Sequence, residues 1–284
     1  MFFMLMLFAS YIHESFILYP HHSSRAFIQI STKKATMNKK QKIINMPKSL
    51  MRPIGQAVVE FKMIKEGDRV LLGLSGGKDS LTLLHALRHL QRHAPIKFSI
   101  AAITIDPEID GFDPSVLKTY LAELDVPYFY ENNDMVKQAE EQMTNDSFCS
   151  FCSRMKRGIM YSTARRESYN VLALGQHLDD LAESFLMSAF HGGQLRTMKA
   201  NYTNQDGDIR IIRPMIYVRE HQTTEFAQKF TLPVIPDSCP ACFDMPTQRD
   251  RMKKLLAEQE THNSGLFKSL RTALHPLYSV NDAS

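Results

Sequence analysis

Tryptophan is absent from this 284-residue sequence, and the chain contains neither an internal repeat nor a low-complexity tract. Nothing therefore indicates a repeat architecture. The net charge is only +4, which does not by itself indicate a nucleic-acid-binding protein. The composition is otherwise that of an ordinary globular protein, and the length suffices for one large or two small domains.

A recognisable leader is lacking as well. Residues 1–8 are apolar but too few to span a bilayer, no basic segment precedes them, and no small-residue cleavage site follows cleanly. We interpret residues 1–36 as an upstream extension, disordered or loosely attached, with translation beginning at Met37 or Met46; a weak signal peptide is the alternative. We therefore expect a cytoplasmic protein in a reducing compartment, without a membrane partner and without structural disulfides.

Cysteine is scarce but regularly spaced. All four cysteines fall into two C-x-x-C pairs, Cys149 with Cys152 and Cys239 with Cys242. Thiolates at this spacing can face one metal centre, so the two pairs predict a four-thiolate site if the fold brings them together. Spacing alone leaves three interpretations open, namely a structural zinc ion, a redox-active pair and an iron–sulfur cluster.

Two common phosphate-binding patterns, G-x-x-x-x-G-K-[ST] and G-x-G-x-x-G, are also absent. Instead, an apolar run at 70–74 ends in S-G-G-K-D-S, and leucines at helical spacing follow. A strand, a tight turn and a helix in this order expose backbone N–H groups at the positive end of the helix dipole. The pattern predicts a di- or triphosphate site, although a glycine-rich turn without a ligand is the alternative. Its residues are Ser75, Gly76, Gly77, Lys78, Asp79 and Ser80.

Three side chains of this site have expected roles. Lys78 adds a mobile positive charge, and Asp79 and Ser80 can cap the helix that follows. Asp79 could also help to hold a magnesium ion bound to the phosphates.

The rest of the chain alternates strands with helices. We expect helices that include 49–64 and 113–124, and strands at 70–74, 98–105, 126–130, 171–174 and 209–212. Such alternation predicts an α/β fold with a doubly wound, parallel, five-stranded sheet. Ligands of these sheets bind at the carboxyl ends of the strands. The S-G-G-K-D-S segment at 75–80, called the glycine loop below, should meet Asp106 and the turn at Gly175 there.

Two further segments carry candidate polar groups. G-Q-H-L-D-D follows the strand at 171–174, so His177 and Asp179 are candidates for contacts to magnesium, phosphate or a base. A structural histidine and a helix cap would give the same pattern. A basic stretch at 153–158 begins a predicted helix, in which Lys156 or Arg157 could reach the phosphates of a nucleotide or of an RNA backbone. The alternative is that the stretch is only a solvated surface.

Four motifs occur in one fixed order: S-G-G-K-D-S, C-x-x-C-S-R-x-x-R-G, G-x-H-x-D-D and a second C-x-x-C. Over residues 51–251 the sequence resembles the tRNA 2-thiocytidine synthetase family of PP-loop ATP pyrophosphatases. The resemblance implies a Rossmann-like PP-loop ATPase fold with a C-terminal, cysteine-bearing helical segment. We divide the chain into the extension at 1–36, a basic helical segment at 37–66, the PP-loop domain at 67–230 and the C-terminal segment at 231–284.

The resemblance also implies an activity. A member of this family uses Mg²⁺ and ATP to adenylate the C2 carbonyl oxygen of an anticodon-loop cytidine in tRNA, and sulfur then replaces that oxygen with release of AMP. A [4Fe–4S] cluster on three cysteines is implied, with its fourth iron open to sulfide. Cys149 and Cys152 match two ligands, and Cys239 is favoured over Cys242 as the third. The implied partners are tRNA and a sulfur donor such as a cysteine desulfurase, and we allow for a homodimer.

Site residues follow from the same motifs. Catalytic positions are matched by Asp79, Lys156 and Asp179. Nucleotide-binding positions are the loop at 75–80, Gly175 and His177. We expect RNA contacts from Arg154, Arg157 and Arg249.

The sequence departs from the family pattern in two places. Residues 243–249 replace a segment that usually begins with a short Gly-Ser-Gln stretch, and Leu178 replaces a basic residue before the paired acids. A divergent paralogue acting on another tRNA or a smaller substrate would show such changes. The other functions we consider are a PP-loop ligase or amide-forming enzyme with a structural zinc site and a non-catalytic RNA-binding protein. Metal analysis and a product assay distinguish these two functions from the thiolation that the resemblance implies.

Overall fold

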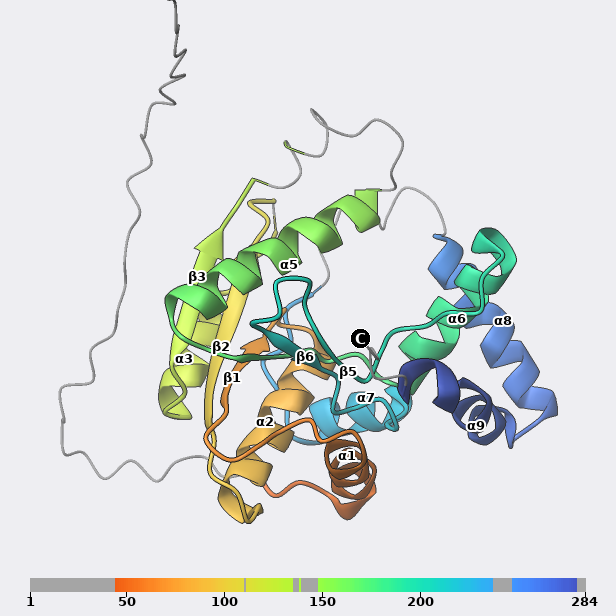
Figure 1. Cartoon of the computed structure of the whole chain (residues 1–284), viewed down its shortest axis with the longest axis horizontal. Helices are drawn as coiled ribbons and strands as arrows, with labels where there is room; N and C mark the ends of the chain where they lie inside the picture. The colour runs from red at the N-terminus through yellow and green to blue at the C-terminus, as the bar shows by residue number, and fades with distance from the viewer. Residues whose placement is uncertain (1–43, 110, 135–137, 139–147, 237–246, 280–284) are drawn as a thin grey trace, which may run out of the picture. The chain divides into compact units, whose positions relative to one another are not determined.

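A six-stranded, mostly parallel sheet organises the chain (Figure 1). The computed structural model describes residues 44–109, 111–134, 138, 148–236 and 247–279. Within these residues the strand order is β3-β2-β1-β4-β6-β5. The strands are β1 Arg69–Gly73, β2 Ser99–Asp106, β3 Tyr128–Asn132, β4 Val171–Ala173, β5 Asn201–Thr203 and β6 Arg210–Ile212. Four of the five pairings are parallel, and β5 pairs with β6 in the antiparallel direction.

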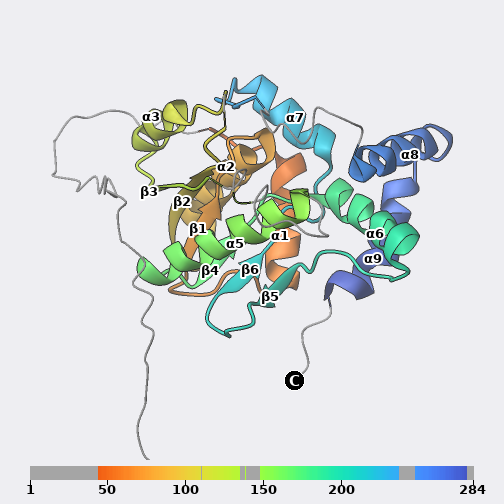
Figure 2. The same cartoon turned by 90° about the horizontal axis from the view of Figure 1, so that it is seen from above.

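Helices cover both faces of the sheet (Figure 2). They are α1 Lys48–Glu60, α2 Lys78–His93, α3 Ser115–Glu123, α5 Phe148–Arg166, α6 Leu178–Gly192, α7 Glu220–Lys229, α8 Gln248–His262 and α9 Leu266–Ser279. Alternate residues of a strand point to opposite faces, so Leu71 and Leu172 join Met160 of α5 in one buried cluster. Val70 and Leu72 join the larger cluster on the other face, to which α1, α2, α3, α7 and α9 contribute.

This arrangement confirms the prediction of a doubly wound α/β fold with C-terminal helices, and it corrects the number of strands. All five expected strands are present, but β5 is a sixth. Asn201–Thr203 has only three residues and no apolar run, so its sequence carries no strand signal. It is a strand because it pairs with the edge of β6.

Several boundaries also differ from the prediction. Helix α1 ends at Glu60 rather than at residue 64, because Lys62 adopts a left-handed φ of +49°. Strand β3 starts at Tyr128 rather than at residue 126, because the Val126 N–H closes the turn after α3 by donating to Leu121. Helix α3 starts at residue 115 rather than 113. Helix α5 starts at Phe148, ahead of the basic stretch expected to begin it.

The predictions for residues 1–36 fall outside the described residues, and the division of the chain at residues 66 and 230 stays a prediction. Among the helices that the structure describes, none is both long and apolar enough to cross a bilayer.

Candidate nucleotide site

The loop between β1 and α2 lies at the switch point of the sheet, because β1 has β2 on one side and β4 on the other. Gly76 in this loop has a φ of +86°, a left-handed conformation that favours glycine. Its carbonyl accepts a 3.0 Å hydrogen bond from the Ile235 N–H. A Cβ on Gly76 would lie 2.6 Å from Ile235 Cδ1. Both the backbone conformation and the close approach of Ile235 therefore require glycine here.

Two serines close the loop internally. Ser75 Oγ accepts from the Gly77 N–H at 3.3 Å and donates to Ser80 Oγ at 3.3 Å. Ser80 Oγ in turn donates to the Gly77 carbonyl at 2.9 Å. Helix α2 begins at Lys78 with Gly77 in the N-cap position and no side-chain cap. The expected capping by Asp79 or Ser80 is therefore wrong, because both side chains have other partners.

The connection between β4 and α6 packs directly on this loop. A Cβ on Gly175 would lie 3.2 Å from the Ser80 backbone nitrogen and 3.3 Å from its Cα. His177 is the N-cap of α6, since its Nδ1 accepts from the Asp180 N–H at 3.4 Å. The Asp180 carboxylate accepts from the His177 N–H at 2.9 Å. Helix capping thus explains Asp180, whereas Asp179 has different partners.

Replacing Gly175 by alanine should disturb the glycine loop, because the added methyl group would press on the Ser80 backbone, which is part of α2 and would have to shift by a few tenths of an ångström. We expect a loss of about 1–3 kcal/mol in the free energy of unfolding and weaker ATP binding. Gly158→Ala is the matched control, because a Cβ on Gly158 of α5 meets no atom within 4 Å. Urea unfolding and calorimetric ATP titration of both variants test this expectation, and equal behaviour of the two would contradict it.

Besides Asp180, whose Oδ2 lies 3.3 Å from His177 Nδ1, the carboxylates of Asp79 and Asp179 also approach the His177 ring. Its Nε2 lies 3.8 Å from Asp79 Oδ2, and its Nδ1 lies 3.6 Å from Asp179 Oδ2. Asp79 also accepts hydrogen bonds from Thr223 Oγ1 and from Lys78 Nζ, the latter at 3.0 Å. His177 and Asp179 are buried, whereas 28% of the Asp79 side chain is exposed. Asp79 is therefore the more accessible carboxylate of the two.

The start of α7 supplies partners that no motif predicts. Arg219 Nε lies 3.1 Å from Asp179 Oδ1, and the Glu220 N–H donates to Asp179 Oδ2 at 2.8 Å. Arg219 also pairs with both oxygens of Glu260, at 2.7 Å and 2.9 Å, and stacks on the Phe267 ring. Both oxygens of Asp179 are thus engaged by α7, and Arg219 links α6, α7, α8 and α9. The catalytic role expected of Asp179 stays a prediction.

Glu220 lies between two lysines. Its Oε1 accepts from Lys78 Nζ at 3.1 Å and from Lys253 Nζ at 2.8 Å. Burial raises the pKa of Glu220, but the hydrogen bonds from Lys253 and Lys78 outweigh burial and lower it to about 2. Burial lowers the pKa of Lys78, but the charges of Asp79 and Glu220 outweigh burial and raise it. Lys78 and Glu220 are therefore both charged at neutral pH.

A buried acid lies on the neighbouring turn of α6. Glu183 is 4% exposed, and burial together with the nearby charge of Asp180 raises its pKa to about 7 despite the opposing charge of Arg249. Arg249 Nε lies 3.5 Å from Glu183 Oε2, and Arg249 Nη1 lies 3.8 Å from Asp180 Oδ1. Arg249, an expected RNA contact, is therefore shared with two acids of α6, although its side chain is 47% exposed.

The raised pKa of Glu183 predicts a pH-dependent stability. The folded protein holds this proton between about pH 4.5 and pH 7, whereas the unfolded chain releases it, so the contribution of Glu183 to stability is lost as the pH rises through about 7. Glu183→Gln removes that loss. We expect the variant to gain about 2 kcal/mol relative to the parent between pH 5 and pH 8. Urea unfolding at several pH values checks this, with the exposed Glu225→Gln as control; a pH-independent difference would contradict it.

The remaining expected site residues lie on α5 and in the C-terminal segment. Arg154, Lys156 and Arg157 are exposed on α5, and Cys152 is half-buried. Cys239 and Cys242 lie outside the described residues, and of Cys149 only the backbone is described, within α5. Among the described side chains, no three His, Cys, Asp or Glu residues are arranged to hold a metal ion. The metal ligands therefore stay a prediction.

Described residues that are near each cysteine pair in the sequence contact the end of β1 or the glycine loop. Met160 of α5 packs beside Gly73 at the end of β1, since its Sδ would lie 3.1 Å from a Cβ there. Because α5 runs on into β4, its amino end lies toward the carboxyl edge of the sheet, and Cys152 is about two helical turns before Met160. Ile235, four residues before Cys239, is hydrogen-bonded to the loop itself.

The chain matches both a protein-family model and full-length relatives over most of its length. A family model described as a PP-loop domain matches residues 46–259. The chain is similar to the tRNA-cytidine(32) 2-sulfurtransferase of Geobacter sulfurreducens, with 41% identity over 228 residues, or 80% of this chain and 89% of the relative. The enzyme of the same name from Geobacter metallireducens is 41% identical over 224 residues, or 78% of this chain and 86% of the relative.

Among solved structures, the chain is similar to the U34-tRNA thiolase NcsA from Methanococcus maripaludis with its [4Fe-4S] cluster. The TM-score is 0.66, and the match covers 89% of this chain and 88% of the other. Sequence identity is 21%, so this likeness supports the fold alone.

Proposed function

Because this chain belongs to the tRNA-cytidine(32) 2-sulfurtransferase family of PP-loop proteins, we propose that it is an ATP-dependent tRNA sulfurtransferase. Its substrate would be cytidine 32 of tRNA, whose C2 oxygen is replaced by sulfur. The observation that carries the proposal is the meeting of the glycine loop with His177 and the start of α7 at one edge of the sheet. The names of the relatives do not favour a ligase with a structural zinc ion.

The proposed chemistry has two displacements. The C2 oxygen of cytidine attacks the α-phosphorus of ATP, the bond to the β-phosphate oxygen breaks, and pyrophosphate leaves. Sulfur at the oxidation level of hydrosulfide then attacks C2 and loses its proton, and the C2–O bond breaks as AMP carries the oxygen away. Adenylation is needed because a carbonyl oxygen is a poor leaving group.

Residues of the glycine loop would support the first displacement. The backbone N–H groups of Gly76 and Gly77 and the Lys78 ammonium group would neutralise charge on the departing pyrophosphate. Asp79 is the proposed ligand of Mg²⁺, because carboxylate oxygens suit this ion and the Asp79 side chain is partly exposed. Thr223 and His177 would hold Asp79 in place, since both contact its carboxylate.

The second displacement would depend on the cysteines. Their thiolates suit an iron–sulfur cluster by donor type, and Cys149 and Cys152 are one turn apart at the amino end of α5, where the helix dipole favours anionic ligands. Cys149, Cys152 and Cys239 would hold a [4Fe–4S] cluster, with Cys242 as the alternative third ligand. When bound, the cluster would supply sulfur to C2. Lys156, exposed on the next turn of α5, is proposed to reach the nucleotide.

Analysis of tRNA nucleosides by mass spectrometry tests the proposal. A strain lacking this gene should lose 2-thiocytidine from its tRNA, and the intact gene should restore it at position 32. Lys78→Ala should not restore it, whereas Lys97→Ala, which changes an exposed lysine beyond α2, should restore it fully. Unchanged 2-thiocytidine in the deletion strain would refute the function.

Partners and location follow from the substrate. A cysteine desulfurase with a thiol reductant is the proposed source of sulfur, and the cytoplasm is the proposed place of reaction because tRNA is modified there. The homodimer stays a prediction.

A further inference from the structure

Two lysines from distant parts of the chain share one carboxylate beside the glycine loop. Lys78 is the first residue of α2, and Lys253 is on α8. Both Nζ atoms contact the same Glu220 Oε1, at 3.1 Å and 2.8 Å, and Lys253 Nζ also lies 2.6 Å from Oε2. The two ammonium groups are therefore close enough together to bind one phosphoryl group.

We propose that Lys253 is a second lysine for the β,γ-phosphates of ATP and that Glu220 occupies the position of these phosphates when no nucleotide is bound. This inference rests on the proposed function only in assuming that ATP binds the glycine loop. On binding, a phosphate displaces the Glu220 carboxylate from Lys78 and Lys253, and the C-terminal helix α8 thereby becomes part of the nucleotide site.

Charge and burial support this assignment over an ordinary surface ion pair. An ordinary surface ion pair joins one lysine to one exposed carboxylate. Here two lysines contact the same carboxylate, Glu220, and only 24% of the Glu220 side chain is exposed. Lys78 also contacts Asp79, the proposed magnesium ligand. A triphosphate with bound Mg²⁺ would satisfy both lysines and Asp79 together, because it presents phosphate oxygens and a cation in one ligand.

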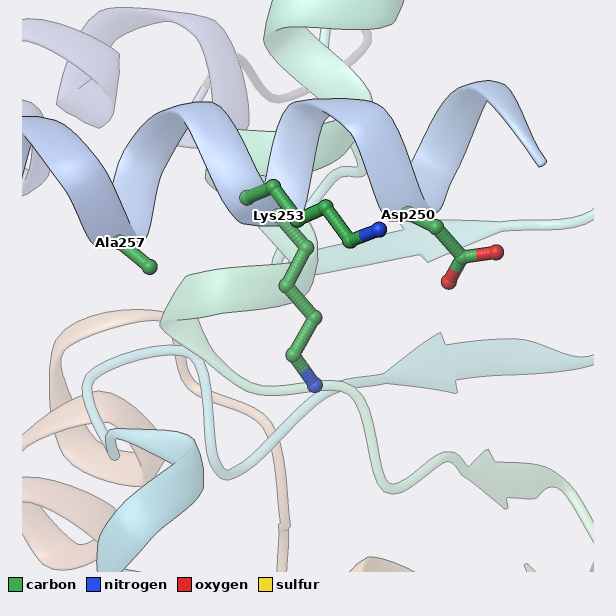
Figure 3. A pocket seen from close by; sticks show the side chains of 4 residues that line it. Asp250, Lys253 and Ala257 are labelled. Atoms are coloured by element: carbon green, nitrogen blue, oxygen red, sulfur yellow. The ribbon is translucent and has the colours of Figure 1, made fainter. Parts of the chain in front are cut away.

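Lys253 must be able to move when a phosphate replaces the Glu220 carboxylate as its partner. Lys253 keeps 53% of its side chain exposed and stands at a hollow along α8 with Asp250, Lys254 and Ala257 (Figure 3). Its ammonium group can therefore move toward a phosphate without unpacking the helix. The helix itself is fixed, because Thr247 and Asp250 form a capping box and Met252 and Leu256 are buried.

Calorimetric titration in Mg²⁺ without tRNA tests the inference, with ATP, pyrophosphate and AMP as separate probes. Lys253→Met should weaken the binding of ATP and pyrophosphate about tenfold or more, because a charge-assisted hydrogen bond is lost. AMP binding should change less than twofold, since AMP lacks the β,γ-phosphates. Lys254→Met, one residue farther along the same helix, is the matched control and should leave all three affinities unchanged.

Glu220→Gln is the second arm of the test. If Glu220 competes with phosphate, its neutral variant should bind ATP several-fold more tightly. The inference is wrong if Lys253→Met binds ATP as the parent does, or if Glu220→Gln weakens ATP binding, because Glu220 would then be a direct ligand of magnesium. A parent chain that binds ATP with the expected variant pattern but forms no 2-thiocytidine would support this inference and refute the proposed function. A parent chain that binds no ATP would refute both.

Discussion

Replacing Asp79 by alanine should abolish AMP formation while leaving the iron content unchanged. The carboxylate of Asp79 is the accessible acid at the start of α2, and it contacts Lys78, Thr223 and His177. Without it, the proposed Mg²⁺ would lose a ligand and Lys78 would lose a partner. We expect the rate of tRNA-dependent AMP release to fall by about three orders of magnitude, as is typical when charge stabilisation in a transition state is removed. Radiolabelled ATP and iron determination on the same sample measure the two effects.

Two further variants identify the cause of that loss. Asp79→Asn keeps the hydrogen bond from Thr223 but not the charge, so it should be nearly as inactive as Asp79→Ala. Asp208→Asn is the control and should retain full activity. Asp208 is an exposed residue that pairs with Arg165 and lies just before β6, at the edge of the sheet opposite to the glycine loop. An active Asp79→Asn would show that charge at this position is not required, and the magnesium role of Asp79 would then be wrong.

Local features of the fold, such as the glycine loop next to Asp79, can be predicted from the sequence, whereas features that depend on distant parts of the chain cannot. The glycine loop is a local feature, because an apolar run, two glycines and a helical leucine pattern lie within one short segment, and the structure has β1, the loop and α2 as expected. The five predicted strands lie in segments of four to eight mostly apolar residues. Strand β5 has no such pattern and depends on an antiparallel partner, so only tertiary structure defines it.

The sequence does not predict which side chains contact Asp79 and Asp179. Arg219, Glu220 and Thr223 contact residues that lie 40 to 144 positions earlier in the chain, and they belong to no motif that predicts such contacts. One signal was present, because an Arg-Glu pair directly follows the buried run Met215 to Val218 at the expected ligand edge. The prediction that Asp79 caps α2 is wrong for a related reason, because its carboxylate accepts a hydrogen bond from Thr223 of α7 instead of capping its own helix.

Replacing Cys149 by alanine should have the opposite effect to Asp79→Ala: iron and thiolation should be lost while ATP affinity changes less than twofold. Cys149 lies in the first turn of α5, about three turns from Met160, which packs beside β1, so the variant leaves the glycine loop untouched. Iron determination on anaerobically purified protein, 2-thiocytidine formation and ATP titration measure the three properties. If both Cys149→Ala and Asp79→Ala lose iron and ATP binding together, the two roles are not separable.

The second cysteine pair allows a sharper version of the same test. The Ile235 N–H is hydrogen-bonded to the Gly76 carbonyl, and Cys239 follows Ile235 by four residues, a length of chain that spans about 14 Å at most. Cys242 is three residues farther along, and its reach is correspondingly less restricted. Cys239 is also the cysteine that is followed directly by a proline, Pro240. We therefore expect Cys239→Ala to lose iron and thiolation and Cys242→Ala to retain both. The reverse result would make Cys242 the third ligand, and loss in both variants together with one bound zinc ion would mean that four thiolates hold a structural metal instead.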